Sequence, residues 1–464
     1  MADRFLTRGF VHLSLGVGLL GGFGLGGASF AASALGLPTG AYWPALAQSH
    51  GHAQLFGFAG LMVLGVALVF LPRLRGAPLR GAEWVPLVLV LYGGGVIVRV
   101  VIQSGAPFLG PLGLGRFGFA AGGVIALSAL LELAGALIGT GLLATTGVSG
   151  PPLAQRPGLR QVLPLLVAAW LGFLAALALN TLAAFDALWR SLLGDGIPLV
   201  GQAPWLLDPA LDALLVRIAF LGWLVPMSVA FAARNFPLFL WTKPAPGRWL
   251  TWGLVVLMAG LTLDVAASLF GLFAEIGTAL EGIALLWLTA VVGALGAKKP
   301  PPGRPRDPTE AQLAGLTRLP LTEAFVWLAV AGALLLLRAA LPFLGLPPPP
   351  EDVLRHTLGA GFVMLLIVGM SLRLIPGFAG GVHLDRLRAA GAAIWSAQVA
   401  ALLRVAPPLA LWLTTTAGLD PAPPRLVSVL LSFSGLAGAI SLAALWLTLS
   451  PALAARSDPY DSPQ

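Results

Sequence analysis

Residues 49–58 read SHGHAQLFGF and open an apolar run that ends at Pro72. Counted from His52, glycine stands at +5, an aromatic residue at +6, glycine at +13 and proline at +20. The same frame starts again at His356 and continues with Gly361, Phe362, Gly369 and Pro376. A weaker form starts at Arg217 and continues with Gly222, Trp223, Ala230 and Pro237. One helical template is therefore used three times, which suggests a metal or haem site held between related helices.

The composition excludes a soluble globular protein. Hydrophobic residues make up 58% of the 464 residues, charged residues only 10%, and the mean hydropathy is +0.90. Globular chains carry about 25% charged residues on average, and repeated apolar runs of about 20 residues are typical of membrane-spanning helices. We therefore expect an all-α polytopic membrane protein, with residues 1–464 forming a single membrane domain.

Three further features restrict the class of protein. The chain contains no cysteine, which excludes disulfides, thiolate metal sites and cysteine nucleophiles. Its net charge of +8 comes from basic residues in short loops between apolar runs, so we attribute it to membrane topology and exclude nucleic acid as a partner. The first apolar run is too long for a signal peptide and lacks a cleavage site of small residues, so we interpret it as a membrane span.

The hydropathy pattern predicts twelve transmembrane helices. Their approximate ranges are 9–35, 50–72, 83–104, 115–147, 160–185, 208–233, 248–273, 275–297, 321–345, 352–376, 388–415 and 425–449. The three frames fall on spans 2, 6 and 10, four spans apart. We therefore expect three four-helix units around a pseudo-threefold axis, over residues 1–158, 159–300 and 310–450.

The distribution of lysine and arginine predicts the orientation. Basic residues concentrate at the N-terminus and in the loops after even-numbered spans, which places both termini in the cytoplasm. This orientation puts His52, Arg217 and His356 at one level near the outer membrane surface. A proline-rich cytoplasmic linker is expected at 299–310 and a disordered tail at 457–464.

The chain has only five histidines: His12, His50, His52, His356 and His383. His52 and His356 occupy equivalent frame positions on two spans, and two imidazoles from facing helices are a common way to bind haem iron. We expect them to hold haem b, with Gly57 and Gly361 leaving room for the macrocycle. The alternative is that both imidazoles are hydrogen-bonded at helix ends.

The other histidines fit such a site less well. His50 and His52 point about 200° apart on a helix, so they cannot both face one iron. His50 either binds a second metal such as copper or is solvated at the start of its helix. His12 and His383 either form an inner metal site or serve packing and solvation.

Charged residues inside the spans are the remaining candidates. Arg99, Arg217, Arg338 and Arg404 fall in the outer halves of their spans, where a charge needs a partner. Haem propionates would bind guanidinium through two hydrogen bonds, with Arg355 beside His356 the best-placed candidate and Arg217 the next. The alternative partners are Asp186, Asp264, Glu275 and Glu281. Glu132 in span 4 is either a proton relay or a carboxylate satisfied by a neighbouring helix, and Met62, Met364 and Met370 are interpreted as core residues.

The stretches His50-Gly51-His52-Ala53-Gln54-Leu55-Phe56-Gly57-Phe58 and Arg355-His356-Thr357-Leu358 resemble the two hallmark stretches of the NnrS family. These are twelve-span membrane proteins that contain haem and copper and are linked to nitric oxide stress and denitrification. The resemblance implies haem b, allows copper, and implies nitric oxide binding or detoxification, or electron transfer, near the outer face of a prokaryotic inner membrane. This chain departs from the family pattern at Ala53-Gln54 and at Gly377-Phe378-Ala379-Gly380, which weakens the expectation of copper more than that of haem.

The layout also resembles the catalytic subunit of haem-copper oxidases and nitric oxide reductases. That subunit needs further histidines on spans 6, 7 and 10, and this chain has no histidine between His52 and His356. If the protein is an enzyme, we therefore expect an oxidoreductase acting on nitric oxide and not a proton-pumping oxygen reductase. Two other functions stay open: a transporter that binds a small anion through the outer-half arginines, and a haem-bearing accessory subunit of a respiratory complex.

Overall fold

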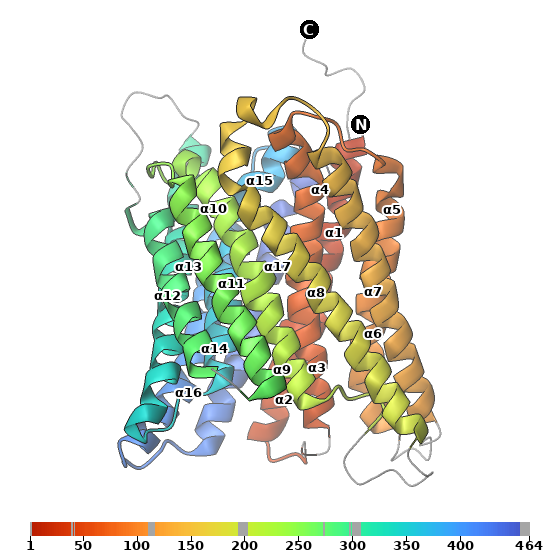
Figure 1. Ribbon diagram of the computed structural model, residues 1–464, viewed down its shortest axis with the longest axis vertical. Coiled ribbons are helices and arrows are strands. Elements are labelled where there is room, and N and C mark those ends of the chain that lie inside the picture. The colour runs from red at the N-terminus through yellow and green to blue at the C-terminus, as the bar shows by residue number, and fades with distance from the viewer. Residues whose placement is uncertain are drawn as a thin grey trace.

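The computed structural model describes residues 2–454, except residues 39, 41, 110–116, 194–202, 272–273, 297 and 299–307. All regular secondary structure in these residues is helical, and twelve stretches of 23–37 residues are long and apolar enough to cross a membrane (Figure 1). The predicted all-α, multi-pass architecture is confirmed. The predicted tail and residues 299–307 of the predicted linker lie outside the described residues.

Several spans consist of more than one helical segment. Span 1 contains α1 (Ala2–Val17), η1 (Gly18–Gly24) and α2 (Leu25–Ala34); span 2 contains α3 (Trp43–His52), η2 (Ala53–Gly60) and α4 (Leu61–Arg75). Span 3 contains η3 (Ala82–Trp84), α5 (Val85–Val88), η4 (Leu89–Gly93), α6 (Gly94–Gly105) and η5 (Ala106–Phe108). Span 6 contains α9 (Pro209–Arg217), η7 (Ile218–Leu224) and α10 (Val225–Phe239); span 10 contains α14 (Glu351–His356), η10 (Thr357–Met364) and α15 (Leu365–Phe378).

The remaining spans are single helices. They are α7 (Phe117–Gly147), α8 (Pro157–Leu193), α11 (Gly247–Phe270), α12 (Ala274–Val292), α13 (Pro308–Ala340), α16 (Leu387–Thr416) and α17 (Pro424–Ala454). The short 3₁₀ segments η6 (Leu153–Gln155), η8 (Ala294–Gly296) and η9 (Leu341–Leu344) lie at loops or helix ends.

Three spans start at least seven residues earlier than the hydropathy pattern predicts, and the first of them begins at Ala2. Span 2 begins at Trp43 with Pro44 in its first turn, and span 9 begins at Pro308, so the last residues of the predicted linker are helical. Proline is favoured in the first turn because the amide hydrogen that it lacks has no partner there. His50 therefore lies within a regular helix and not at its start.

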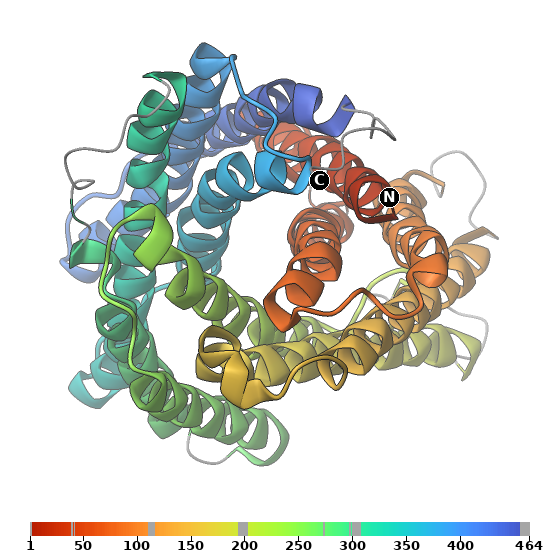
Figure 2. The same ribbon diagram turned by 90° about the horizontal axis from the view of Figure 1, so that it is seen from above.

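Spans 2, 6 and 10 form the centre of the bundle. Their most apolar windows are 83%, 67% and 78% buried, against 33–50% for the other nine spans. Figure 2 shows these three spans in orange, lime green and light blue on the inside, with the other helices around them. The chain segments that carry the repeated frame are therefore the ones surrounded by protein and not by lipid.

The frame has a structural counterpart in all three central spans. A π-helical segment begins at the residue after His52, after Arg217 and after His356. Such segments are rare and are often found at functional sites. Figure 1 places α3, α9 and α14, which carry these three residues, in the lower half of the bundle.

The frame glycines allow close helix packing. A Cβ atom at Gly57 would clash with Val17 of span 1, and one at Gly361 would lie 2.6 Å from Trp327 of span 9. In span 6, the carbonyl oxygen of Gly222 would clash with a Cβ atom at Gly172 in span 5. Each central span thus packs at this level against the span that precedes it in the chain. Gly57 and Gly361 make room for neighbouring helices, in contrast to the expectation that they make room for a macrocycle.

Candidate functional site

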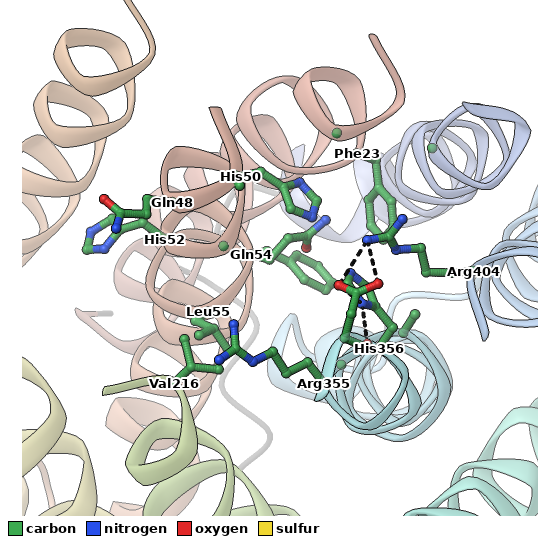
Figure 3. A pocket seen from close by; sticks show the side chains of 18 of the residues that line it. Phe23, Gln48, His50, His52, Gln54, Leu55, Val216, Arg355, His356 and Arg404 are labelled. Atoms are coloured by element: carbon green, nitrogen blue, oxygen red, sulfur yellow. Dashed lines mark hydrogen bonds and ion pairs between the residues drawn. The ribbon is translucent and has the colours of Figure 1, made fainter. Parts of the chain in front are cut away.

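A cavity of about 560 Å³ lies between spans 1, 2, 3, 6, 10, 11 and 12 (Figure 3). Its wall is mostly apolar, and its charged and imidazole side chains are His50, His52, Arg99, Asp212, Asp352, Arg355, His356 and Arg404. Five glycines bring backbone to the wall: Gly26, Gly27, Gly51, Gly359 and Gly435. The cavity therefore combines an apolar volume of cofactor size with a few polar groups, as cofactor sites do.

His50 and His356 face each other across part of this cavity. Their ring centres are 6.4 Å apart and their planes differ by 18°. Figure 3 shows the two rings near each other, with His52 pointing away from both. The two rings are thus nearly parallel, and both line the cavity.

Hydrogen bonds fix the orientation of both rings. Nδ1 of His50 lies 2.9 Å from the carbonyl oxygen of Gly22, and Nδ1 of His356 lies 2.7 Å from that of Asp352. A carbonyl oxygen only accepts, so Nδ1 carries a proton in each ring, and Nε2 is the nitrogen left to bind a metal. A backbone carbonyl that accepts from one ring nitrogen while the other nitrogen binds metal is a usual arrangement for histidine ligands.

Close packing holds His50 in this position. A Cβ atom at Gly26 of α2 would lie 2.7 Å from Nδ1 of His50, so any larger residue would push the ring away. Helix α2 is itself held against α17, where a Cβ atom at Gly435 would clash with Cα of Gly27. The approach of spans 1, 2 and 12 therefore depends on these glycines.

The spacing of the two rings fits ligation of one iron. Metal–imidazole bonds are about 2.0–2.1 Å long, and a ring nitrogen lies about 1.1–1.2 Å from its ring centre. Two imidazoles on opposite sides of one metal therefore have ring centres about 6.2–6.6 Å apart. The observed 6.4 Å falls within this range.

His52 has a different partner from the one expected. Its Nε2 lies 3.0 Å from Oε1 of Glu132 on α7, and both side chains are buried. His50 and His52 are two positions apart on a regular helix, so when His50 faces His356 the ring of His52 points to the other side. The structure thus brings His356 together with His50 and not with His52. Oε1 of Glu132 is paired with a neighbouring helix, whereas its Oε2 is buried without a hydrogen-bond partner among the described residues.

Three arginines line the cavity: Arg99, Arg355 and Arg404. Arg404 lies 3.3 Å from Asp352, Arg355 lies 3.8 Å from Glu351, and Nε of Arg99 donates to Gln103 at 3.0 Å. Within the described part of the chain, Nη1 of Arg99, Nε of Arg355 and Nη1 of Arg404 are buried without a hydrogen-bond partner. Buried guanidinium groups with spare donors favour an anionic group in the cavity.

Arg217 has other partners. It forms ion pairs with Asp264 of α11 and Glu281 of α12, and its Nη2 donates to Thr278 at 3.2 Å. Arg217 is expected from the sequence to bind a haem propionate or to pair with acidic residues. The structure shows the second arrangement, with the acidic residues on spans 7 and 8. Likewise, Arg338 pairs with Glu351 at 3.0 Å.

His12 and His383 have separate partners. Nδ1 of His12 accepts from the indole nitrogen of Trp446 at 2.9 Å, and Nδ1 of His383 lies 3.8 Å from Glu310. His12 therefore has a packing role in span 1. His383 is largely exposed, with 64% of its side chain accessible.

Sequence reasoning missed Asp352, the residue that holds both His356 and Arg404. Its side-chain Oδ1 lies 3.2 Å from Nδ1 of His356, in addition to its carbonyl contact. The spacing of four residues between Asp352 and His356 on a helix would have indicated this pair.

Among the described residues, no group of three or more histidine and acidic side chains is arranged to hold a metal ion. A site for haem needs only the two axial nitrogens, because the macrocycle supplies the other ligands. Comparisons with protein-family models and with curated proteins found no match to this chain.

Proposed function

We propose that this chain is a haem b-binding integral membrane protein in which His50 and His356 are the axial ligands. It binds or detoxifies nitric oxide, or passes electrons, near the outer face of the membrane, in the manner of the NnrS family. The observation that carries this proposal is a pair of near-parallel imidazole rings, each held through Nδ1, whose centres are 6.4 Å apart. Bound haem would supply a one-electron redox centre and, with one axial position released, a site for a diatomic gas.

The chain's own residues prepare the cavity for such a group. The carbonyl oxygens of Gly22 and Asp352 accept from Nδ1 of the two imidazoles and leave Nε2 of each ring as the nitrogen available to a metal. Arg99, Arg355 and Arg404 offer spare guanidinium hydrogens that can neutralise carboxylates. The apolar remainder of the wall limits the access of water and accommodates a flat hydrophobic ring.

The proposed location is the inner membrane of a prokaryote, with both termini in the cytoplasm. The bias of lysine and arginine toward the loops after even-numbered spans supports this orientation. In this orientation α3, α9 and α14, which end at His52, Arg217 and His356, lie toward the outer side of the membrane. A redox partner or respiratory complex would then act on the periplasmic side.

The test is the absorption spectrum of the purified protein. We expect a reduced b-type spectrum that changes on addition of nitric oxide. It should be lost in His50→Ala and His356→Ala and kept in the control His383→Ala, whose ring is largely exposed. A colourless protein after expression with sufficient haem would contradict the proposal.

A second candidate function is transport of a small anion. It is favoured by the three cavity arginines with unpartnered nitrogens, which would bind a free anion as well as a haem carboxylate. Anion uptake into vesicles that is lost in Arg355→Ala, with protein that contains no haem, would support transport. Haem in the cavity with no anion uptake would support the first function.

A further inference from the structure

A second cavity, of about 60 Å³, lies between spans 2, 6 and 10. Each of these three spans contributes the residues at positions +10 and +14 of the repeated frame to the wall. The positions are counted from His52, Arg217 and His356. These residues are Met62 and Val66, Met227 and Phe231, and Leu366 and Met370. The cavity therefore lies where the three central helices face one another.

The second cavity lies one helical turn from the first. On span 2, Ala59 lines the large cavity and Met62 the small one. Leu224 and Met227 on span 6, and Val363 and Leu366 on span 10, have the same spacing of three residues. One turn advances a helix by about 5 Å, so a single layer of side chains separates the two cavities.

The wall of the small cavity is chemically suited to an apolar occupant. Its only hydroxyl groups belong, among the described residues, to Ser228 and Ser371. Oγ of Ser371 lies 3.9 Å from the sulfur of Met62, to which it donates. A buried water needs two to four polar partners, and apolar cavities instead stay dry and take up xenon or small hydrocarbons.

We propose that this small cavity binds a neutral diatomic gas and passes it to the large cavity. Apolar gases dissolve in the lipid around the bundle, whereas an ion or a larger molecule would fit neither the polarity nor the volume. The layer between the cavities includes Met62, Met227 and Met364, whose unbranched side chains change rotamer readily. That nitric oxide is the natural occupant rests on the proposed function; the affinity for an apolar gas does not.

Crystals pressurised with xenon test the site directly. We expect an anomalous xenon peak between Met62, Met227 and Met370 in the wild-type protein. Val66→Phe should fill the cavity and remove the peak, while Val167→Phe, at a lipid-facing position that is 50% exposed, should leave it. If Val66→Phe does not fold, Ser228→Leu is used in its place, because it fills the same cavity from span 6 and should also remove the peak. No peak in the wild type, or a peak that persists in a folded filled variant, would overturn the inference.

The measurement separates this inference from the proposed function. Xenon binding does not require haem, so a xenon peak in a protein that binds no haem overturns only the haem proposal. A haem protein without the xenon peak overturns only the gas site. In haem-loaded protein, we further expect slower nitric oxide association in Val66→Phe with an unchanged reduced spectrum; an unchanged rate would overturn the passage of gas between the cavities.

Discussion

His52 on α3 and Glu132 on α7 are joined by a buried hydrogen bond of 3.0 Å between spans 2 and 4. Arg217 and Glu281 make the corresponding contact between spans 6 and 8. A Cβ at Gly95 would lie 2.8 Å from Cγ of Glu132, and one at Gly260 would lie 2.9 Å from Cγ of Glu281. In two of its three copies, the first residue of the frame therefore pairs with a buried glutamate that packs closely against a glycine.

This relationship predicts that His52 stabilises the bundle. His52→Ala leaves Oε1 of Glu132 buried without its partner, and an unsatisfied buried polar group costs about 1–3 kcal/mol. Thermal unfolding in detergent should show the loss, and Glu132→Gln, which keeps a hydrogen-bonding side chain without the charge, should lose less. Equal stability of His52→Ala and wild type would contradict the assignment.

The same reasoning applies to Arg217. Arg217→Ala leaves Asp264 and Glu281 buried together without a cation, so we expect a loss of about 3–5 kcal/mol in the free energy of unfolding. The ratio of haem to folded protein should stay unchanged, because Arg217 pairs away from the cavity. A loss of haem with unchanged stability would contradict this assignment and indicate that Arg217 contacts the cofactor. Arg190→Ala is the control: its partners Asp186 and Asp208 are both partly accessible to solvent, so it should change stability by less than about 1 kcal/mol.

Helix packing through glycine gives a matched pair of variants. Gly172→Ala places a methyl group against the carbonyl oxygen of Gly222, and overpacking of this kind costs about 1–3 kcal/mol. Gly123→Ala, within α7, meets no atom within 4 Å and should be neutral or stabilise by up to about 1 kcal/mol. The comparison of their unfolding midpoints checks the contact between spans 5 and 6. Similar midpoints for the two variants would contradict the close contact between spans 5 and 6 at Gly172.

The cavity arginines should control cofactor affinity. A hydrogen bond to a charged group contributes about 1.5–3 kcal/mol, so Arg355→Ala or Arg404→Ala should weaken haem binding by roughly ten- to a hundredfold. Haem titration of the apoprotein measures this change directly. Arg190→Ala again serves as the control, and an unchanged affinity in both cavity variants would show that the haem carboxylates lie elsewhere.

The sequence alone predicts the architecture well because membrane burial leaves a strong pattern. Apolar runs give all twelve spans, and the frame from His52, Arg217 and His356 identifies the three central ones. The sequence could not show which two histidines lie close together. Whether His50 or His52 faces His356 depends on where helix α3 begins and on its rotation, which a close contact with Gly26 determines. A contact between α2 and α3 cannot be predicted from the hydropathy of the sequence.

The roles of the frame residues show the same limit. Equivalent positions indicated equivalent environments, yet His52 and Arg217 bind carboxylates of later spans, whereas His356 binds Asp352 on its own helix. Spacing along one helix predicts depth in the membrane. It does not predict which neighbouring helix carries the partner, because that depends on packing between residues far apart in the chain.

The most direct test of the central claim is the electron paramagnetic resonance spectrum of the ferric protein in two matched variants. His50→Gln and His52→Gln replace nearby histidines of one helix, and glutamine can keep the hydrogen bond to Glu132. We predict the low-spin spectrum of a bis-imidazole haem in the wild type and in His52→Gln, and its loss in His50→Gln. A low-spin spectrum that survives in His50→Gln and disappears in His52→Gln would contradict the assignment of His50 and His356 as the axial pair.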